Sequence, residues 1–325
     1  MKIGMIFPGY GSQYVGMAKD VYDASRAMQE YFDQASLCVD INFIKLCFAS
    51  SDVELAKMQQ AYSALFIVSS SLYATLAHEG IEPDVVTGYN IGLYAAMHAA
   101  KGLSFADGLY VLKKLTLFAQ ELLDRESYGM LRIKGPSTEE LTLLLKQIAQ
   151  DQLSIAVYEL PNQHIIVGSE QVVDNSLQQL KALPDIKIEE ISSAFGLHAA
   201  YMQPAIDAFK IYLEKVDFKD IAIPMISNVS GEYVHEGTQL KEEVIQHLTQ
   251  PVQWLECLRA LHTCDIILSV GPGTDLVDMA KQLYPHKVVM GISSLADIEM
   301  IKKIIEEKKL EQTEEAPILE QKQDN

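Results

Sequence analysis

The sequence lacks the features that mark nucleic-acid-binding and membrane-spanning proteins. Its 325 residues carry 26 lysines and arginines against 44 aspartates and glutamates, a formal net charge of −18, and no dense basic run. A nucleic-acid-binding protein needs a basic footprint for the phosphates, so no nucleic-acid partner is expected. No apolar run reaches the ~18 residues that indicate a membrane helix, so no membrane partner is expected either.

Cysteine is scarce and has no metal-binding spacing. The four cysteines contain no C-x-x-C pair, which is typical of reduced thiols rather than of a disulfide framework or a zinc site. The histidines show no H-E-x-x-H or paired spacing, so no metal site is predicted. Residues 1–13 lack the apolar segment and cleavage site of a signal peptide. These absences together predict a cytoplasmic protein.

What is present indicates a large α/β protein. Hydrophobic residues make up 49% of the chain and charged residues 22%, enough to bury a sizeable core. Apolar strand-like runs at residues 3–7, 85–88 and 265–270 end in glycine-containing turns and alternate with helical patterns. Residues 128–193 have the order β-α-β-β-α-β, typical of a ferredoxin-like unit. We therefore predict a core formed by residues 1–127 and 194–300, a ferredoxin-like insert at 128–193 and a charged, disordered tail at 301–325.

Residues 85–96 have the pattern of a nucleophile elbow. Two glycines flank a central residue between a strand and a helix, as in G-x-S-x-G, but the central residue is Asn90. Such a turn needs positive φ, which asparagine tolerates, and it places backbone N–H groups where an oxyanion can be held. A carboxamide is not a useful nucleophile. The pattern therefore predicts an elbow without its reactive group; a plain strand–turn–helix junction is the alternative.

Several ordered motifs resemble the malonyl-CoA:acyl-carrier-protein acyltransferase family (ACP S-malonyltransferases). Residues 7–17 resemble its opening F-P-G-Q-G-S-Q-x-x-G-M, and residues 88–96 resemble G-H-S-L-G-E-Y-A-A. Residues 161–168 resemble P-G-Q-x-V-I-S-G, and residues 198–205 match H-x-x-x-M-x-P-A. Further landmarks follow in order at residues 228–229, 251–254 and 270–273, so the resemblance covers about residues 1–295.

The resemblance implies an α/β-hydrolase-like large domain with an inserted ferredoxin-like small subdomain. It implies a two-step reaction: a serine takes malonyl from coenzyme A, and the phosphopantetheine thiol of an acyl carrier protein then takes it from the serine, with histidine as general base. An arginine on the helix after the elbow would pair with the malonyl carboxylate. No cofactor is implied; acyl carrier protein is the implied partner and acyl-CoA the implied donor.

Carried over residue by residue, the resemblance gives a site in which several chemical groups are replaced. The implied positions are the nucleophile position Asn90, the general-base position His198, the oxyanion donors Tyr10 and Ile91 through their backbone N–H groups, the arginine position Leu115, and the substrate-binding Gln163. Other polar family positions are also changed: they hold Tyr62, Ser63, Tyr89 and Leu93.

Four functions remain open at this stage. The chain is an impaired or silent malonyltransferase-type protein, a non-catalytic partner of a synthase that binds a carrier protein or an acyl chain, an acyl hydrolase, or a working transferase in which the carrier thiol attacks directly with His198 as base. Hydrolysis also requires the missing serine. Whether the chain is an enzyme is left open.

Overall fold

The large domain is built on a six-stranded sheet. A computed structural model describes residues 1–192 and 198–320. The sheet order is β10-β9-β1-β2-β7-β8, formed by β1 (Ile3–Phe7), β2 (Val85–Gly88), β7 (Met225–Ile226), β8 (Tyr233–Val234), β9 (Ile266–Val270) and β10 (Val288–Ile292). All neighbouring pairs are parallel except β7–β8. Strands β1, β2 and β9 are buried along their whole length, which explains their continuous apolar sequence.

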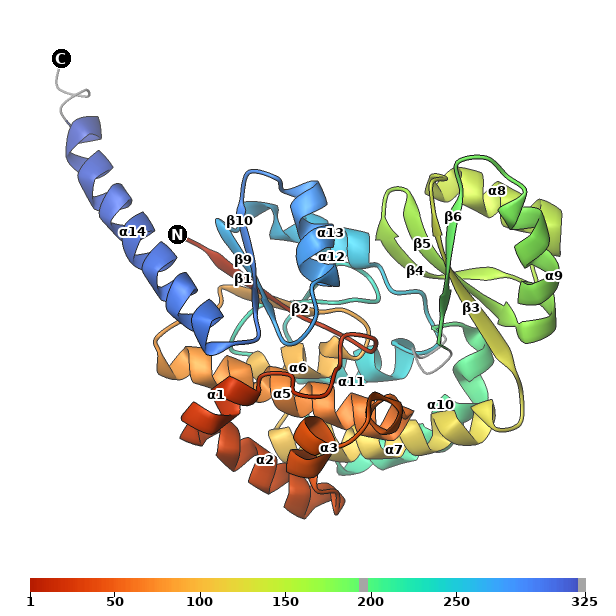
Figure 1. The fold of residues 1–325 in the computed structure, drawn as a ribbon, viewed down its shortest axis with the longest axis horizontal. Coiled ribbons are helices and arrows are strands. Elements are labelled where there is room, and N and C mark those ends of the chain that lie inside the picture. The colour runs from red at the N-terminus through yellow and green to blue at the C-terminus, as the bar shows by residue number, and fades with distance from the viewer. Residues whose placement is uncertain (193–197, 321–325) are drawn as a thin grey trace.

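Helices cover both faces of this sheet. Figure 1 shows α5 (Met58–His78) and α6 (Gly92–Ala99) below the sheet and α12 (Trp254–Ala260) and α13 (Asp275–Leu283) above it. The helix α7 (Phe105–Leu123) packs on α5. The remaining α-helices of the large domain are α1 (Lys19–Ala24), α2 (Arg26–Val39), α3 (Phe43–Ala49), α4 (Asp52–Leu55), α10 (Gln203–Phe209), α11 (Gly237–Gln246) and α14 (Leu295–Glu320).

The small subdomain has its own sheet and its own core. Its elements are β3 (Tyr128–Lys134), α8 (Thr138–Ala149), β4 (Ser154–Leu160), β5 (Gln163–Ser169), α9 (Glu170–Lys181) and β6 (Lys187–Ile191). The strands form an antiparallel sheet of order β4-β5-β3-β6, as in the ferredoxin-like arrangement. The α/β class with a small antiparallel subdomain is therefore confirmed. The predicted boundary at residues 193 and 194 lies outside the described residues.

The prediction of a disordered tail from residue 301 is wrong over residues 301–320. The structure continues α14 to Glu320, and Figure 1 shows this helix extending away from the domain. Ile298, Ile301 and Ile305 are buried, at the i, i+3, i+7 spacing of one helix face. The run of Glu and Lys that follows Ile305 obscured this apolar stripe in the sequence. Residues 321–325 lie outside the described residues.

Two strands were not predicted. The edge strand β8 has only two residues, too few for a pattern, and β10 follows the short turn His286–Lys287 without an alternating signal. Within residues 1–192 and 198–320, no helix combines the length and the apolar character that a bilayer crossing requires.

Candidate functional site

The elbow joins β2 to α6 through two glycines that cannot carry a side chain. A Cβ on Gly88 would lie 2.1 Å from the Gly92 carbonyl carbon, and one on Gly92 would lie 2.1 Å from the Phe7 carbonyl oxygen. Between them Asn90 has φ 54, the left-handed region that asparagine adopts more easily than most residues. The predicted elbow geometry is therefore confirmed.

The Asn90 carboxamide lies between the predicted base and the predicted oxyanion donor. Its Nδ2 contacts His198 Nε2, and its Oδ1 accepts a hydrogen bond of 2.6 Å from the backbone N–H of Ile91. Both Asn90 and His198 are fully buried. The amide nitrogen therefore faces the ring nitrogen of His198, while the amide oxygen occupies the backbone N–H predicted to be an oxyanion donor.

Backbone contacts fix the tautomer of His198. Its Nδ1 lies 2.7 Å from the carbonyl oxygen of His247, so Nδ1 carries the proton and Nε2 keeps the lone pair that accepts from Asn90. The ring of His247 lies edge-on to it, with ring centroids 4.8 Å apart. Burial, and then the neighbouring His198, hold the pKa of His247 well below its usual value. The low pKa favours the neutral form of the His247 ring, and the general-base role of His198 stays a prediction.

The elbow is held from the opposite side by Asn228. Its Nδ2 donates to the carbonyl oxygens of Gly88, at 2.9 Å, and Asn90, at 3.1 Å. Asn228 is fully buried. The sequence analysis found this residue only as a landmark of the resemblance and gave it no role; the structure makes it a clamp on the strained turn.

A buried polar network ties the elbow to the small subdomain. The Tyr89 hydroxyl donates to Glu159 Oε1. The same carboxylate receives Arg132 Nε at 2.8 Å, Arg132 Nη2 at 2.9 Å and Gln163 Nε2 at 2.9 Å. Burial, and then the charge of Glu159, raise the pKa of Tyr89 well above its usual value. Tyr89 is therefore a neutral donor at the position where the family pattern has histidine.

Sequence reasoning missed Arg132 and Glu159. Their sequence signal is weak: each is a charged residue flanked by apolar residues in a strand, Arg132 in β3 and Glu159 in β4, and β3 also ends in Lys134. A buried charge is retained only where it has a partner, so a search for opposite charges in buried strands would have paired them. Gln163 was predicted from the resemblance; its amide nitrogen is held by Glu159, and its proposed contact with substrate stays a prediction.

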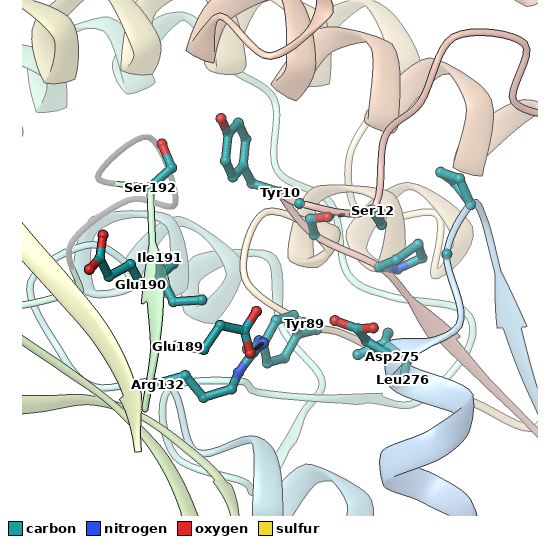
Figure 2. Close-up of a pocket in the computed structure, with 15 residues that line it drawn as sticks. Tyr10, Ser12, Tyr89, Arg132, Glu189, Glu190, Ile191, Ser192, Asp275 and Leu276 are labelled. Carbon is teal, nitrogen blue, oxygen red and sulfur yellow. Dashed lines mark hydrogen bonds and ion pairs between the residues drawn. The ribbon is translucent and has the colours of Figure 1, made fainter. Parts of the chain in front are cut away.

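A cavity of about 200 Å³ opens beside the elbow, between the two subdomains. It is lined by the loop at residues 8–12, by Tyr89 and Arg132, by residues 189–192 and by the turn and helix start at residues 272–276, and Figure 2 shows Glu189 and Arg132 on one side with Asp275 opposite. Tyr10 lines it, with its hydroxyl donating to the Ala56 carbonyl at 2.9 Å. Asn90 and His198 are not among its lining residues.

The elbow and the loop at residues 8–12 are in direct contact. A Cβ on Gly9 would lie 2.7 Å from the Cβ of Asn90, so the glycine brings the segment before Tyr10 against the elbow. Tyr10, Asn90, Ile91 and His198 are thus placed around one region. The oxyanion role of the Tyr10 and Ile91 N–H groups stays a prediction.

Leu115 lies on α7 and is 1% exposed, within the main hydrophobic core. The nearby Lys114 ammonium lies 4.7 Å from the ring centroid of Tyr212, away from that buried face. For the chain outside residues 193–197 and 321–325, no three His, Cys, Asp or Glu side chains are grouped to hold a metal ion; the absence of a metal stays a prediction.

The chain is similar to known acyltransferases over nearly its whole length. Residues 5–309 match the family model described as an acyl transferase domain. A relative is the malonyl CoA-acyl carrier protein transacylase of Bacillus subtilis (strain 168), 29% identical over 303 residues that cover 92% of this chain and 96% of the relative.

Two solved structures have the same fold. The malonyl-CoA:ACP transacylase of Synechocystis sp. PCC 6803 is 26% identical, with a TM-score of 0.82, over 92% of this chain and 100% of that one. The malonyl-transacylase solved in complex with a type II PKS acyl-carrier protein, PlMCAT:AntF, is 24% identical, with a TM-score of 0.86, over 92% and 98%.

Proposed function

The chain belongs to the acyl transferase domain family, and from that premise we propose that it is a malonyl-CoA:acyl-carrier-protein acyltransferase-type protein of fatty-acid or polyketide synthesis that binds a carrier-borne acyl group but does not pass it on. Transfer in this family type needs an acyl ester on the elbow residue. The elbow of this chain has the backbone geometry for that ester, but Asn90 lacks the hydroxyl group that would form it.

One observation carries the proposal: the Asn90 side chain occupies the backbone donor that a reacting thioester carbonyl would use and the ring nitrogen that would take the proton of an attacking thiol. Its Oδ1 takes the Ile91 N–H at 2.6 Å, and its Nδ2 faces His198 Nε2. A thioester carbonyl reaching this point would meet an oxyanion donor already in use. Direct attack by the carrier thiol with His198 as base is disfavoured for the same reason, because the base already bonds to the amide.

The acyl group that suits this site is uncharged. Leu115 stands at the position of the carboxylate-binding arginine and is packed in the core. A malonyl carboxylate brought there would lose its water without gaining a cation, at a cost of several kcal/mol. An apolar acyl chain has no such penalty.

An acyl carrier protein is the partner we propose. The PlMCAT:AntF structure contains a relative of this fold bound to a carrier protein, and the fold of this chain matches it over 92% of its length. We further propose a cytoplasmic location, which the four free cysteines, three of them buried, support.

The test is acyl loading of a carrier protein. The native chain is incubated with radiolabelled malonyl-CoA and holo carrier protein, and label on the carrier is measured alongside the intact mass of the chain. We expect no label above a protein-free control and no mass increase on the chain. Covalent loading at residue 90, or rapid loading of the carrier, contradicts the proposal.

A second arm examines the acyl preference with Asn90→Ser. The serine variant should become acylated at residue 90 by acetyl-CoA at a measurable rate and by malonyl-CoA far more slowly, because Leu115 still offers no cation. Adding His198→Ala to the serine variant is the control and should abolish the acetylation. Full malonyl transfer by the single Asn90→Ser variant would show that Leu115 does not limit the substrate.

An acyl hydrolase is the second candidate, since water would replace the carrier thiol. The buried state of Asn90 and His198 and the missing ester-forming oxygen argue against it. Release of free acid from acyl-CoA in the same assay separates this activity from transfer.

A further inference from the structure

The cavity beside the elbow has one cationic side chain among its described lining residues, Arg132. Three of its lining residues are acidic: Glu189, Glu190 and Asp275. Among the described residues that line this cavity, Arg132 is therefore the cation that can pair with an anionic group.

The donors of Arg132 are engaged in two different ways. Nε and Nη2 form a two-pronged contact with the carboxylate of Glu159, which is fully buried. Nη1 donates at 3.0 Å to Oε2 of Glu189, whose side chain is 55% exposed. Losing the buried partner would leave an uncompensated charge, whereas an exposed ion pair contributes little and exchanges with solvent.

We propose that Arg132 is an anion receptor of this cavity, and that Glu189 occupies its Nη1 donor until a carboxylate or phosphate oxygen of the ligand displaces it. The inference rests on the proposed function in one respect: it assumes that the ligand reaches the elbow through this cavity. Glu159 holds the guanidinium in a fixed orientation, so Nη1 points at the position that the Glu189 carboxylate now occupies. Figure 2 shows the Arg132 and Glu189 side chains meeting at the cavity wall.

This receptor differs in place from the arginine that the family pattern puts on the helix after the elbow. That position is Leu115, buried on α7, whereas Arg132 lies on β3 of the small subdomain. An acyl carboxylate and the phosphate of a pantetheine arm share the chemistry that Nη1 recognises. The experiment is arranged to separate these two sources.

Glu190 provides a matched control for Glu189. Both are exposed glutamates of β6 and both line the cavity, but the ion pair with Arg132 is made by Glu189. Changing either residue to glutamine removes one negative charge from the same rim. Only Glu189→Gln also removes the charged competitor from Nη1.

The test measures binding of three probes to the native chain, Glu189→Gln and Glu190→Gln by isothermal titration calorimetry at low salt. The probes are 4′-phosphopantetheine, S-malonylpantetheine and pantetheine, which carry a phosphate, a carboxylate and no charge. Glu189→Gln should strengthen binding of at least one charged probe roughly three- to fivefold and change pantetheine binding less than twofold. Glu190→Gln should change each affinity less than twofold.

The charged probe whose affinity increases in Glu189→Gln identifies whether the anion is a carboxylate or a phosphate. Adding Arg132→Lys to Glu189→Gln should remove the gain, because lysine keeps the charge but not the fork that Glu159 orients. If both glutamine variants bind the charged probes more tightly by the same factor, the effect comes only from removing a negative charge beside the cavity, and the inference is overturned. The inference is also overturned if Glu189→Gln binds neither charged probe more tightly than the native chain does, or if neither charged probe binds detectably. Since binding is measured without transfer, covalent loading of residue 90 would sink the proposed function and leave this result standing.

Discussion

The elbow and the wall of the neighbouring cavity differ in what they keep of the acyltransferase pattern. At the elbow the positive φ, the paired glycines and the tautomer-fixing contact of His198 are all present, and Asn90 stands at the nucleophile position. At the wall, Tyr89 and the Arg132–Glu159 pair form a buried polar network. Deeper, Leu115 fills an apolar core position. The difference teaches that backbone geometry and chemical groups are separable: the elbow keeps its turn geometry with a carboxamide at the position where the family pattern has serine.

The largest expected effect is on the elbow backbone. Gly92→Ala would place a Cβ 2.1 Å from the Phe7 carbonyl oxygen, and main chain cannot move aside cheaply, so we expect a loss of roughly 3 kcal/mol or more in the free energy of unfolding. Urea denaturation measures it. Gly291→Ala is the control, because its nearest neighbour would be Val277 Cγ2 at an ordinary 3.5 Å. A near-native stability for Gly92→Ala would show that the elbow is not held by this close approach.

Restoring a cation at position 115 should be almost as costly. Leu115→Arg buries an unpaired charge at a site that is 1% exposed, and we expect a loss of about 3 kcal/mol. The comparison variant Leu115→Met keeps the volume and should lose less than about 1.5 kcal/mol. Thermal unfolding followed by circular dichroism distinguishes them. If the arginine variant is as stable as the native chain, the surroundings of position 115 can accommodate a charged side chain.

A pH-dependent effect should arise next to the clamp on the elbow. Burial raises the pKa of Glu243 on α11 to about 7, although the Ser227 hydroxyl, donating at 2.7 Å, works against the shift. The folded chain then holds a proton that the unfolded chain releases above pH ~4.5. The stability that this group contributes is therefore greatest below about pH 4.5, falls as the pH rises towards 7, and does not change further above that. We expect this group to contribute on the order of 2 kcal/mol, visible as a difference in pH dependence between the native chain and Glu243→Gln. Superimposable profiles would remove Glu243 as the cause.

The smallest expected effect isolates the left-handed backbone of the elbow. Asn90→Ala and Asn90→Gly both lose the contacts of the carboxamide, but only alanine carries a Cβ at φ 54. Glycine adopts that region without strain, so Asn90→Gly should be more stable than Asn90→Ala by about 1 kcal/mol. Equilibrium denaturation of the two variants gives the difference. The reverse order would mean that flexibility of the unfolded glycine chain outweighs the strain.

The elbow could be predicted from sequence because its requirements are local. Gly88, Asn90 and Gly92 lie within five residues, and their spacing alone indicates a sharp strand-to-helix turn. The small subdomain was equally accessible, since its strands and helices follow one another along the chain. Apolar runs there alternate with helical patterns at the lengths of single elements.

The polar network could not be predicted from local spacing, because its members lie far apart in the sequence and meet only in the folded chain. Tyr89 comes from the elbow of the large domain, Arg132 from β3 and Glu159 from β4, and β5 lies between those two strands in the sheet. No local spacing encodes that meeting. The helix beyond residue 300 was missed for another reason: its buried residues, Ile301 and Ile305, are few, and glutamate and lysine dominate the composition of the residues that follow.

The place of β1 in the large sheet has a consequence for how the chain folds during synthesis. β1 pairs with β2 on one side and with β9 on the other, so Ile3 meets Ile266. During synthesis β1 therefore keeps one edge open until the more than 260 residues that separate Ile3 from Ile266 have been made. Contacts of such long sequence separation form slowly, and an open apolar edge can recruit other chains. Chains that stop short of β9 should accordingly aggregate, whereas the small subdomain, whose contacts are local, can form first.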